Sequence, residues 1–177
     1  KPRIFRLEKD EALINRLGFN NHGSETVSRR ISNNHPDGFL GINIGPNKET
    51  KNKEEDYYIC LSRLAMHAGY ITINISSPNT EGLRNFHDQE EMKKLLSGIN
   101  KIINEKKIEC PVAIKISPDI NDNEISKIVD LVSSHKIQGI IVSNTTDSNR
   151  NNLSDIKKHE TGGLSGQPLK DISTSLI

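Results

Sequence analysis

The sequence predicts an α/β fold, a (β/α)8 barrel that is incomplete over these 177 residues. Three observations predict it. Short segments with alternating apolar residues recur along the chain, amphipathic helical patterns separate them, and polar residues follow several of the strand-like segments. Strands that alternate with helices form a parallel sheet. A complete barrel takes about 250 residues, so part of one is expected to be missing.

Four segments have the period-two alternation of a strand: FLGINIG (39–45), YITINI (70–75), VAIKI (112–116) and GIIVSN (139–144). One face of these strands carries Leu, Ile and Val, and the other carries Gly, Ala, Thr, Asn and Lys. An open doubly wound sheet buries both faces, so its strands are apolar throughout. The polar second face therefore favours a closed barrel, whose outer face meets helices and whose inner face meets a ligand.

Helical spacing of apolar residues predicts helices over 52–67, 88–104 and 122–134, and Asn121 or Asp122 is the expected N-cap of the last one. The apolar positions of these helices are Tyr58, Leu61, Leu64, Ala65, Met92, Leu95, Leu96, Ile99, Ile103, Ile125, Ile128, Val129 and Val132. A glycine-rich stretch, ETGGLSGQPL (160–169), is predicted to be a loop before a helix that starts near Pro168. Such loops let backbone N–H groups approach a phosphate or ribityl chain.

Polar residues stand at or near the carboxyl ends of the four predicted strands: Asn43, Asn74, Lys115 and Asn144. Their spacing, about 30 to 40 residues, is that of one strand and its helix. In (β/α)8 barrels the carboxyl ends of the strands form the active site. The sequence therefore predicts one shared site, against the alternative that these residues merely end strands near turns.

Composition excludes several classes of function. A net charge of +1 and 4% aromatic residues without Trp argue against nucleic-acid binding. Cys60 and Cys110 are expected to be reduced thiols, and the histidines show no metal-binding spacing, so no metal is predicted. No apolar run reaches the ~18 residues of a membrane span. The chain starts at Lys1 rather than Met, so it is expected to begin inside a longer one.

The stretch TINISSPNTEGLR (72–84) has the richest side-chain chemistry. No GxSxG motif and no nearby His accompany Ser76 or Ser77, which disfavours a hydrolase triad. A serine in a closed pocket can still remove a proton from carbon if a relay such as Thr80 assists it.

Amide side chains present both a donor and an acceptor, so Asn15, Asn74, Asn79 and Asn144 together could match the edge of a pyrimidine-like ring. Any single Asn is equally a turn or cap residue. Lys115 points inward, where a cation needs an anion. A reduced flavin, a substrate carboxylate or a nearby Asp would serve.

Seven stretches together resemble the dihydroorotate dehydrogenase family, and within it the quinone-dependent, membrane-associated class 2. They stand in the family's order and cover nearly the whole chain: PRIFRL (2–7), INRLGFNNHG (14–23), GINIGPNK (41–48), INISSPNTEGLR (73–84), VAIKISPD (112–119), SNTT (143–146) and TGGLSGQPL (161–169). Class 1 members carry Cys where this chain has Ser77, so SSPN favours class 2.

The resemblance implies a role for individual residues. Ser77 is the catalytic base and Thr80 helps to relay the proton, whereas Ser76, Pro78 and Arg84 are expected to be structural. The substrate-binding positions are Asn15, Arg16, Leu17, Gly18, Phe19, Asn74, Asn79, Asn144 and Thr145. The FMN-binding positions are Asn43, Asn74, Lys115, Ser143 and Gly166, with Ser143 standing where a threonine is common.

The reaction implied by the resemblance is the oxidation of (S)-dihydroorotate to orotate in pyrimidine synthesis. Ser77 takes a proton from C5, C6 gives a hydride to flavin N5, Lys115 stabilises negative charge on the reduced flavin, and a quinone reoxidises FMN. The resemblance also implies a membrane location, through an N-terminal segment not in this chain. That location is the cytoplasmic face of the inner membrane in a bacterium, or the mitochondrial inner membrane in a eukaryote.

The expected organisation is a single FMN-binding barrel domain over residues 1–177, without the N-terminal helices, the first strand and the last βα units. Expressed alone, this piece is expected to bind FMN poorly. Two alternatives remain. One is a non-catalytic truncated barrel fragment. The other is a fumarate- or NAD-linked dihydroorotate dehydrogenase, which Ser77 argues against.

Overall fold

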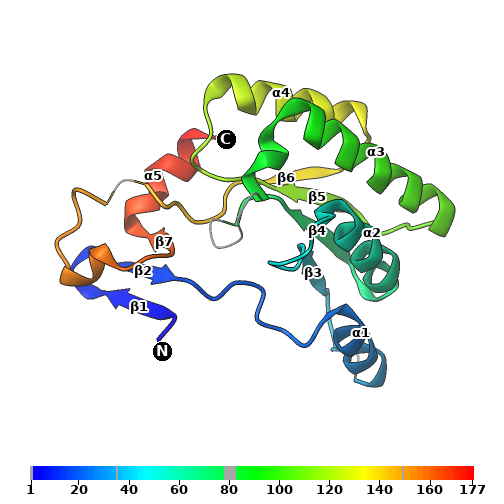
Figure 1. Cartoon of the computed structure of the whole chain (residues 1–177), viewed down its shortest axis with the longest axis horizontal. Coiled ribbons are helices and arrows are strands. Elements are labelled where there is room, and N and C mark those ends of the chain that lie inside the picture. The colour runs from blue at the N-terminus through cyan, green and yellow to red at the C-terminus, as the bar shows by residue number, and fades with distance from the viewer. Residues whose placement is uncertain (1, 35, 78–82, 149) are drawn as a thin grey trace.

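The computed structural model describes residues 2–34, 36–77, 83–148 and 150–177 (Figure 1). Its strands are β1 (Ile4–Leu7), β2 (Ala12–Asn15), β3 (Gly41–Ile44), β4 (Tyr70–Asn74), β5 (Val112–Lys115), β6 (Gly139–Ile141) and β7 (Gly163–Gly166). Its α-helices are α1 (Ser24–Asn33), α2 (Lys53–Leu64), α3 (Gln89–Lys106), α4 (Asp122–Ser134) and α5 (Gln167–Ser175).

The four strands expected from the alternating segments form one parallel sheet in the order β3-β4-β5-β6. Each strand pairs with the next in the sequence, and α2, α3 and α4 provide the crossovers. In Figure 1 these helices lie along the same side of the sheet. Sequential strand order with helices on one side is the arrangement of a barrel segment rather than of a doubly wound sheet. The prediction of an incomplete (β/α)8 barrel is confirmed.

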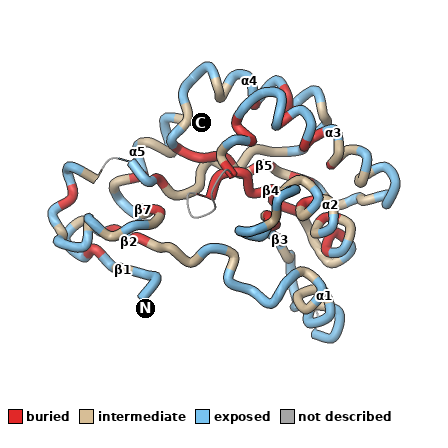
Figure 2. The backbone as a smooth tube through the Cα atoms, viewed as in Figure 1, coloured by how far each residue is buried: buried red, intermediate tan, exposed pale blue. Residues whose placement is uncertain are grey.

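The main core lies between this sheet and its helices. Ile71 and Ile73 of β4 and Ile114 of β5 are fully buried there, packed with apolar residues of α2 and α3. Burial of each such side chain contributes about 1.5–3 kcal/mol relative to exposure. Figure 2 shows the buried residues concentrated on the central strands β4 and β5. The sheet edge at β3 and the N-terminal segment are more exposed.

Helix α4 begins where its cap was expected. The Asn121 side chain accepts a hydrogen bond from the backbone N–H of Glu124 at 3.0 Å, and the Glu124 side chain accepts one from the Asn121 N–H at 2.9 Å. This reciprocal pair satisfies two N–H groups that the helix itself cannot.

For two helices, the prediction of which residues form the apolar face was partly wrong. Val129 of α4 is 44% exposed, and Leu131 is buried in its place with Ile128. Leu131 lies three positions from Ile128 and so shares its face, whereas Val129 is one position, about 100°, further round. In α2 the fully buried tyrosine is Tyr57, while Tyr58 is half-buried.

The glycine-rich stretch, expected to be a loop, contains strand β7. This strand pairs antiparallel with β2, which pairs in turn with β1, so the chain has a second, three-stranded sheet. Gly166 pairs with Ala12 at a φ of +101°, and a Cβ there would lie 2.3 Å from the Glu11 carbonyl oxygen. Only glycine fits that contact. Helix α5 follows at once, as Pro168 predicted.

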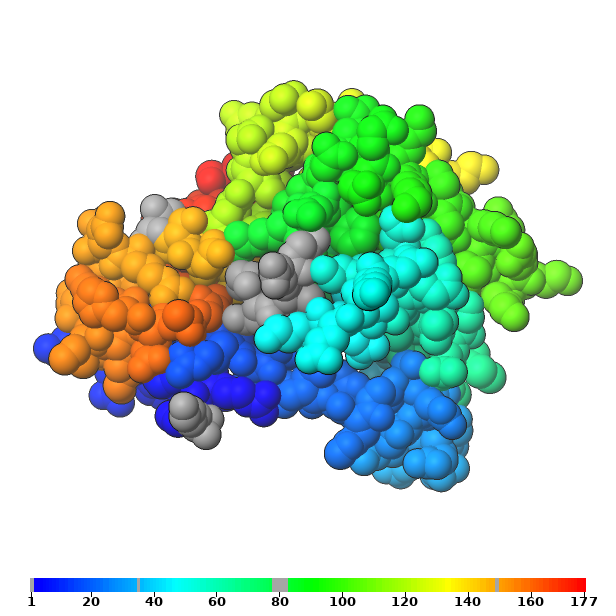
Figure 3. Space-filling view, in the orientation of Figure 1, coloured from blue at the N-terminus to red at the C-terminus, as the bar shows by residue number. Residues whose placement is uncertain are grey.

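The second sheet has a small core of its own, made by Leu7, Ala12, Ile14, Leu153 and Leu164. It joins the N-terminal hairpin to the segment that follows β6. Figure 3 shows these two parts of the chain, far apart in sequence, side by side on the surface.

Candidate functional site

Three of the four predicted strand-end residues lie together at the carboxyl ends of β4, β5 and β6. Asn74 and Lys115 are register partners in adjacent strands. The backbone N–H of Asn144 donates to the Ile116 carbonyl at 2.9 Å, which places Asn144 just beyond β6. The side chain of Asn144 then reaches Asn74, and its Nδ2 lies 3.2 Å from Asn74 Oδ1. The parallel register thus builds the polar cluster that the sequence spacing predicted.

A serine that was expected to be structural lies inside this cluster. Ser76 is fully buried, and its hydroxyl lies 3.2 Å from Asn74 Oδ1 and 3.0 Å from Asn144 Nδ2. Its backbone N–H donates to the same Asn74 oxygen at 3.2 Å. The structure therefore adds Ser76 to the polar contacts of the site. Its place two residues after Asn74, where an Asx turn forms, was the available sequence signal.

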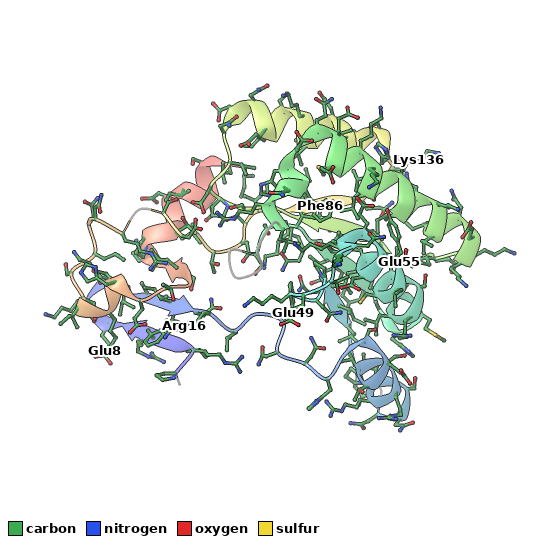
Figure 4. The ribbon with its side chains drawn as sticks, in the orientation of Figure 1. Glu8, Arg16, Glu49, Glu55, Phe86 and Lys136 are labelled. Atoms are coloured by element: carbon green, nitrogen blue, oxygen red, sulfur yellow. The ribbon has the colours of Figure 1, made fainter. Side chains whose placement is uncertain are left out.

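Tyr57 supports the cluster from behind. Its hydroxyl donates to the Asn74 backbone carbonyl at 2.6 Å, and its ring meets Phe86 edge-on at 5.8 Å. Burial raises the pKa of Tyr57 well above the usual tyrosine value, so it stays a neutral donor. Figure 4 labels Phe86 near the middle of the molecule, beneath α3. Helix α2 is thereby fixed to the last residue of β4.

Lys115 is half-buried at the end of β5. Within the ranges that the structure describes, no carboxylate forms an ion pair with it. Of the three anions considered for this lysine, a neighbouring Asp is thus not seen. A partly desolvated ammonium favours an anionic ligand, because burial of an unpaired charge is costly.

Of the segment between β4 and α3, only the residues up to Ser77 and from Leu83 onward are described. Ser77 is 9% exposed and follows Ser76 directly. Asn79 and Thr80 lie outside the described residues. Where the description resumes, Arg84 binds two loops at once: Nη2 lies 3.0 Å from Asp119 Oδ2, and Nη1 lies 2.9 Å from Asp147 Oδ1.

Further contacts tighten this ionic cluster. The Thr146 hydroxyl donates to Asp119, and the Asp119 N–H donates to Ser117 Oγ at 3.1 Å. Burial alone would raise the pKa of Asp147, but the hydrogen bond and charge of Arg84 outweigh it and lower that pKa. Arg84 therefore joins the segments that follow β4, β5 and β6, as its expected structural role implies.

The remaining expected substrate residues lie at the end of β2 and beyond it. Asn15 ends β2, and the side chain of Arg16 pairs with Glu160 at 2.8 Å and lies 4.4 Å over the Phe5 ring. Figure 4 labels Arg16 beside the three-stranded sheet. Its guanidinium therefore joins β2 to the segment before β7. Leu17 and Gly18 continue the chain, with the Leu17 carbonyl accepting from Arg3 at 3.0 Å.

Phe19 and Asn43 meet at a groove of about 480 Å³ between α1, β3 and α2. Gly45 leaves room for the Phe19 ring, because a Cβ there would lie 2.4 Å from a ring carbon. The expected site residues thus form one group around β4–β6 and another around β2 and β3. Thr145 and Ser143 belong to the first group, and Gly166 belongs to the second sheet.

Two properties of the described residues concern membranes and metals. No helix there is both long and apolar enough to cross a membrane. Nor does that part of the chain gather three His, Cys, Asp or Glu side chains as a metal would need.

A parallel sheet with helices on one side and polar side chains at its carboxyl ends defines the ligand-binding end of an α/β barrel. The family model for dihydroorotate dehydrogenase matches residues 1–177, and the chain belongs to that family. The family is flavin-dependent.

Curated relatives agree with this assignment. The dihydroorotate dehydrogenase (quinone) of Klebsiella pneumoniae subsp. pneumoniae is 47% identical over 189 residues, and that of Escherichia coli O1:K1 is 44% identical over 184. Each match covers 100% of this chain and 54% of the relative. The chain thus spans about half the length of these relatives.

Two solved structures of DHODH from Eimeria tenella superpose on the chain. Ligand-free DHODH from Eimeria tenella gives a TM-score of 0.93 at 36% identity, covering 100% of this chain and 56% of that one. The complex of that enzyme with ferulenol gives 0.89, also at 36% identity.

Proposed function

We propose that these residues belong to an enzyme that oxidises (S)-dihydroorotate to orotate, with FMN as cofactor and a quinone as final electron acceptor. The observation that carries the proposal is the buried run Asn74–Ser76–Ser77 at the end of β4, tied to Asn144 at the end of β6. The quinone-dependent relatives named above support the same reaction.

Ser77 is proposed as the base that removes the C5 proton. A serine hydroxyl is a poor base in water, so burial and a relay must assist it. Ser77 meets the first requirement, since it is 9% exposed. Thr80, three residues on, is proposed as the relay.

The substrate ring is proposed to be held by neutral amides. Asn74 and Asn144 are fixed against each other, and Thr145 N–H donates to Asn144 Oδ1 at 2.8 Å. Amides can bind the alternating donors and acceptors of a pyrimidine without adding charge. Asn79 and the segment Asn15–Phe19, namely Asn15, Arg16, Leu17, Gly18 and Phe19, complete the proposed substrate set. Because the Arg16 side chain pairs with Glu160, its backbone is the part proposed to reach a ligand.

The residues present fit a flavin. Lys115 is the half-buried ammonium that an anionic ring would satisfy, and Asn74 lies beside it in register. Asn43, Ser143 and Gly166 are proposed to complete the FMN site. When bound, FMN would supply the acceptor for the hydride that leaves C6 and pass the two electrons to quinone. The protein's part is to place a positive charge and hydrogen-bond donors around it.

Quinones dissolve in lipid, so a membrane location, through a segment outside these residues, is part of the proposal. So is the grouping of residues 1–177 into one FMN-binding barrel domain.

The test is a quinone-reduction assay with dihydroorotate, on the protein expressed from its complete gene. Ser77→Ala should lower kcat by about 10²–10⁴-fold, the usual contribution of a positioned base. Ser134→Ala is the control, since Ser134 lies at the end of α4 and its hydroxyl contacts only local groups, the Leu131 carbonyl at 3.0 Å and His135 Nδ1 at 3.2 Å, among the described residues. Full activity of Ser77→Ala would contradict the assignment of the base. A wild-type protein that does not reduce quinone with dihydroorotate would contradict the proposed function.

A further inference from the structure

The buried Ser76 hydroxyl joins two amide side chains whose orientations decide what the site offers to a ligand. We propose that Ser76 is a positioning residue that sets the polarity of the Asn74–Asn144 pair, so that this pair presents hydrogen-bond donors and selects a ligand oxygen. The inference rests on the proposed function, because the ligand it concerns is the orotate-type substrate.

Two backbone groups fix the amides first. The Ser76 N–H and the Thr145 N–H can only donate, and they face Asn74 Oδ1 at 3.2 Å and Asn144 Oδ1 at 2.8 Å. Each amide must therefore turn its oxygen toward the backbone. The NH₂ of Asn144 is then left to face Asn74, which is the direction that its 3.2 Å contact requires.

The Ser76 hydroxyl completes this arrangement because it can accept and donate at once. It accepts from Asn144 Nδ2 at 3.0 Å and donates to Asn74 Oδ1 at 3.2 Å. Asn74 Oδ1 thus receives three donors: Ser76 N–H, Ser76 O–H and Asn144 Nδ2. That oxygen has no capacity left for a ligand.

The free face of the pair is consequently made of donors. Both N–H groups of Asn74 Nδ2 remain available to a ligand, because none of the described residues accepts a hydrogen bond from them. A ligand group placed there must be an acceptor, such as a ring carbonyl or a carboxylate. A ring N–H at the same point would meet a donor and be rejected.

Without its hydroxyl, Ser76→Ala removes one acceptor from Asn144 and one donor from Asn74. The backbone N–H groups of Ser76 and Thr145 still direct the two amide oxygens, but the pair loses the hydroxyl that bridges it, so the donor face is held less rigidly before the ligand binds. Such preorganisation acts mainly on ligand binding, because the backbone contacts that hold the fold remain.

The experiment measures the orotate dissociation constant from the change in flavin absorbance, together with flavin content and melting temperature, on protein from the complete gene. Ser76→Ala should weaken orotate about tenfold while retaining flavin. Asn144→Ala should weaken it as well, and the double variant should lose less than the product of the two single fold-changes, because the Ser76 hydroxyl acts partly through Asn144. Additive losses would contradict a role exercised through Asn144.

Ser117→Ala is the matched control. Ser117 is equally buried at the end of the neighbouring strand, but its hydroxyl accepts from Asp119 N–H and contacts neither amide. The Ser117→Ala variant should have a lower melting temperature and the same orotate affinity as the wild type. If Ser76→Ala does not fold, Ser76→Cys fills the same space with a weak hydrogen-bonding group and serves the same test.

The outcomes separate the two proposals. Wild-type affinity for orotate in a Ser76 variant that folds overturns this inference and leaves the proposed function standing. A wild-type protein that carries flavin but binds no orotate overturns the proposed function and this inference with it.

Discussion

Replacing Tyr57 by Phe should destabilise the protein, because it removes one hydroxyl and little else. That hydroxyl donates to the Asn74 carbonyl at 2.6 Å in a fully buried position. The phenyl ring keeps the edge-on contact with Phe86, so no cavity of the size of a side chain forms. Loss of a buried hydrogen bond, with an acceptor left behind, costs about 1–2 kcal/mol. In a protein of this size that lowers the melting temperature by about 2–8 °C.

Urea unfolding followed by circular dichroism measures this loss. The midpoint should fall with an unchanged m-value. Tyr58→Phe is the control on the adjacent residue: burial raises the pKa of Tyr58 to about 12, yet its hydroxyl has no hydrogen bond within the described ranges. Its variant should stay within about 0.5 kcal/mol of wild type. Equal stability of the Tyr57 variant and the wild type, or equal losses at both positions, would refute the reasoning.

Three more changes test other parts of the structure. Arg84→Ala should lower the free energy of unfolding, measured in urea, by about 1–2 kcal/mol, since two charge-assisted contacts are lost from a partly exposed site. In the same variant, ¹³C NMR should show the pKa of Asp147 rising toward its ordinary value. Burial lowers the pKa of His87 from 6.5 to about 4, so the folded state resists its protonation. Stability should be full above pH 6.5 and fall as the pH drops toward 4, by up to roughly 3 kcal/mol, and His87→Leu should flatten this dependence in unfolding curves. Ile73→Ala should leave a cavity in the main core and cost about 2–5 kcal/mol by the same assay, whereas a loss below 1 kcal/mol would show that the core collapses around it.

The parallel sheet could be predicted from the sequence because its determinants are local. Alternation places Ile71 and Ile73 on one face of β4 whatever the rest of the chain does, and the Asn121 cap starts α4 by contacts within three residues. Strand β7 could not be predicted in this way. Its glycines look like a loop, and they become a strand only because β2, about 150 residues earlier, offers its edge. The contact of Ser76 with Asn144 was likewise out of reach, because Asn144 lies just beyond β6, 68 residues later in the chain.

The charges around the site explain why Lys115, rather than Arg84, is the better partner for an anion. Arg84 binds both Asp119 and Asp147, so this cluster carries a net negative charge and its cation is already satisfied. Asn74 and Asn144 contribute donors without charge. Among the described residues at the carboxyl ends of β4, β5 and β6, Lys115 is then the ammonium left to meet an anionic ring. Because the Arg84 cluster is negative, it would also disfavour an anion placed close to it, which favours Lys115 as the cationic contact of a negatively charged ligand.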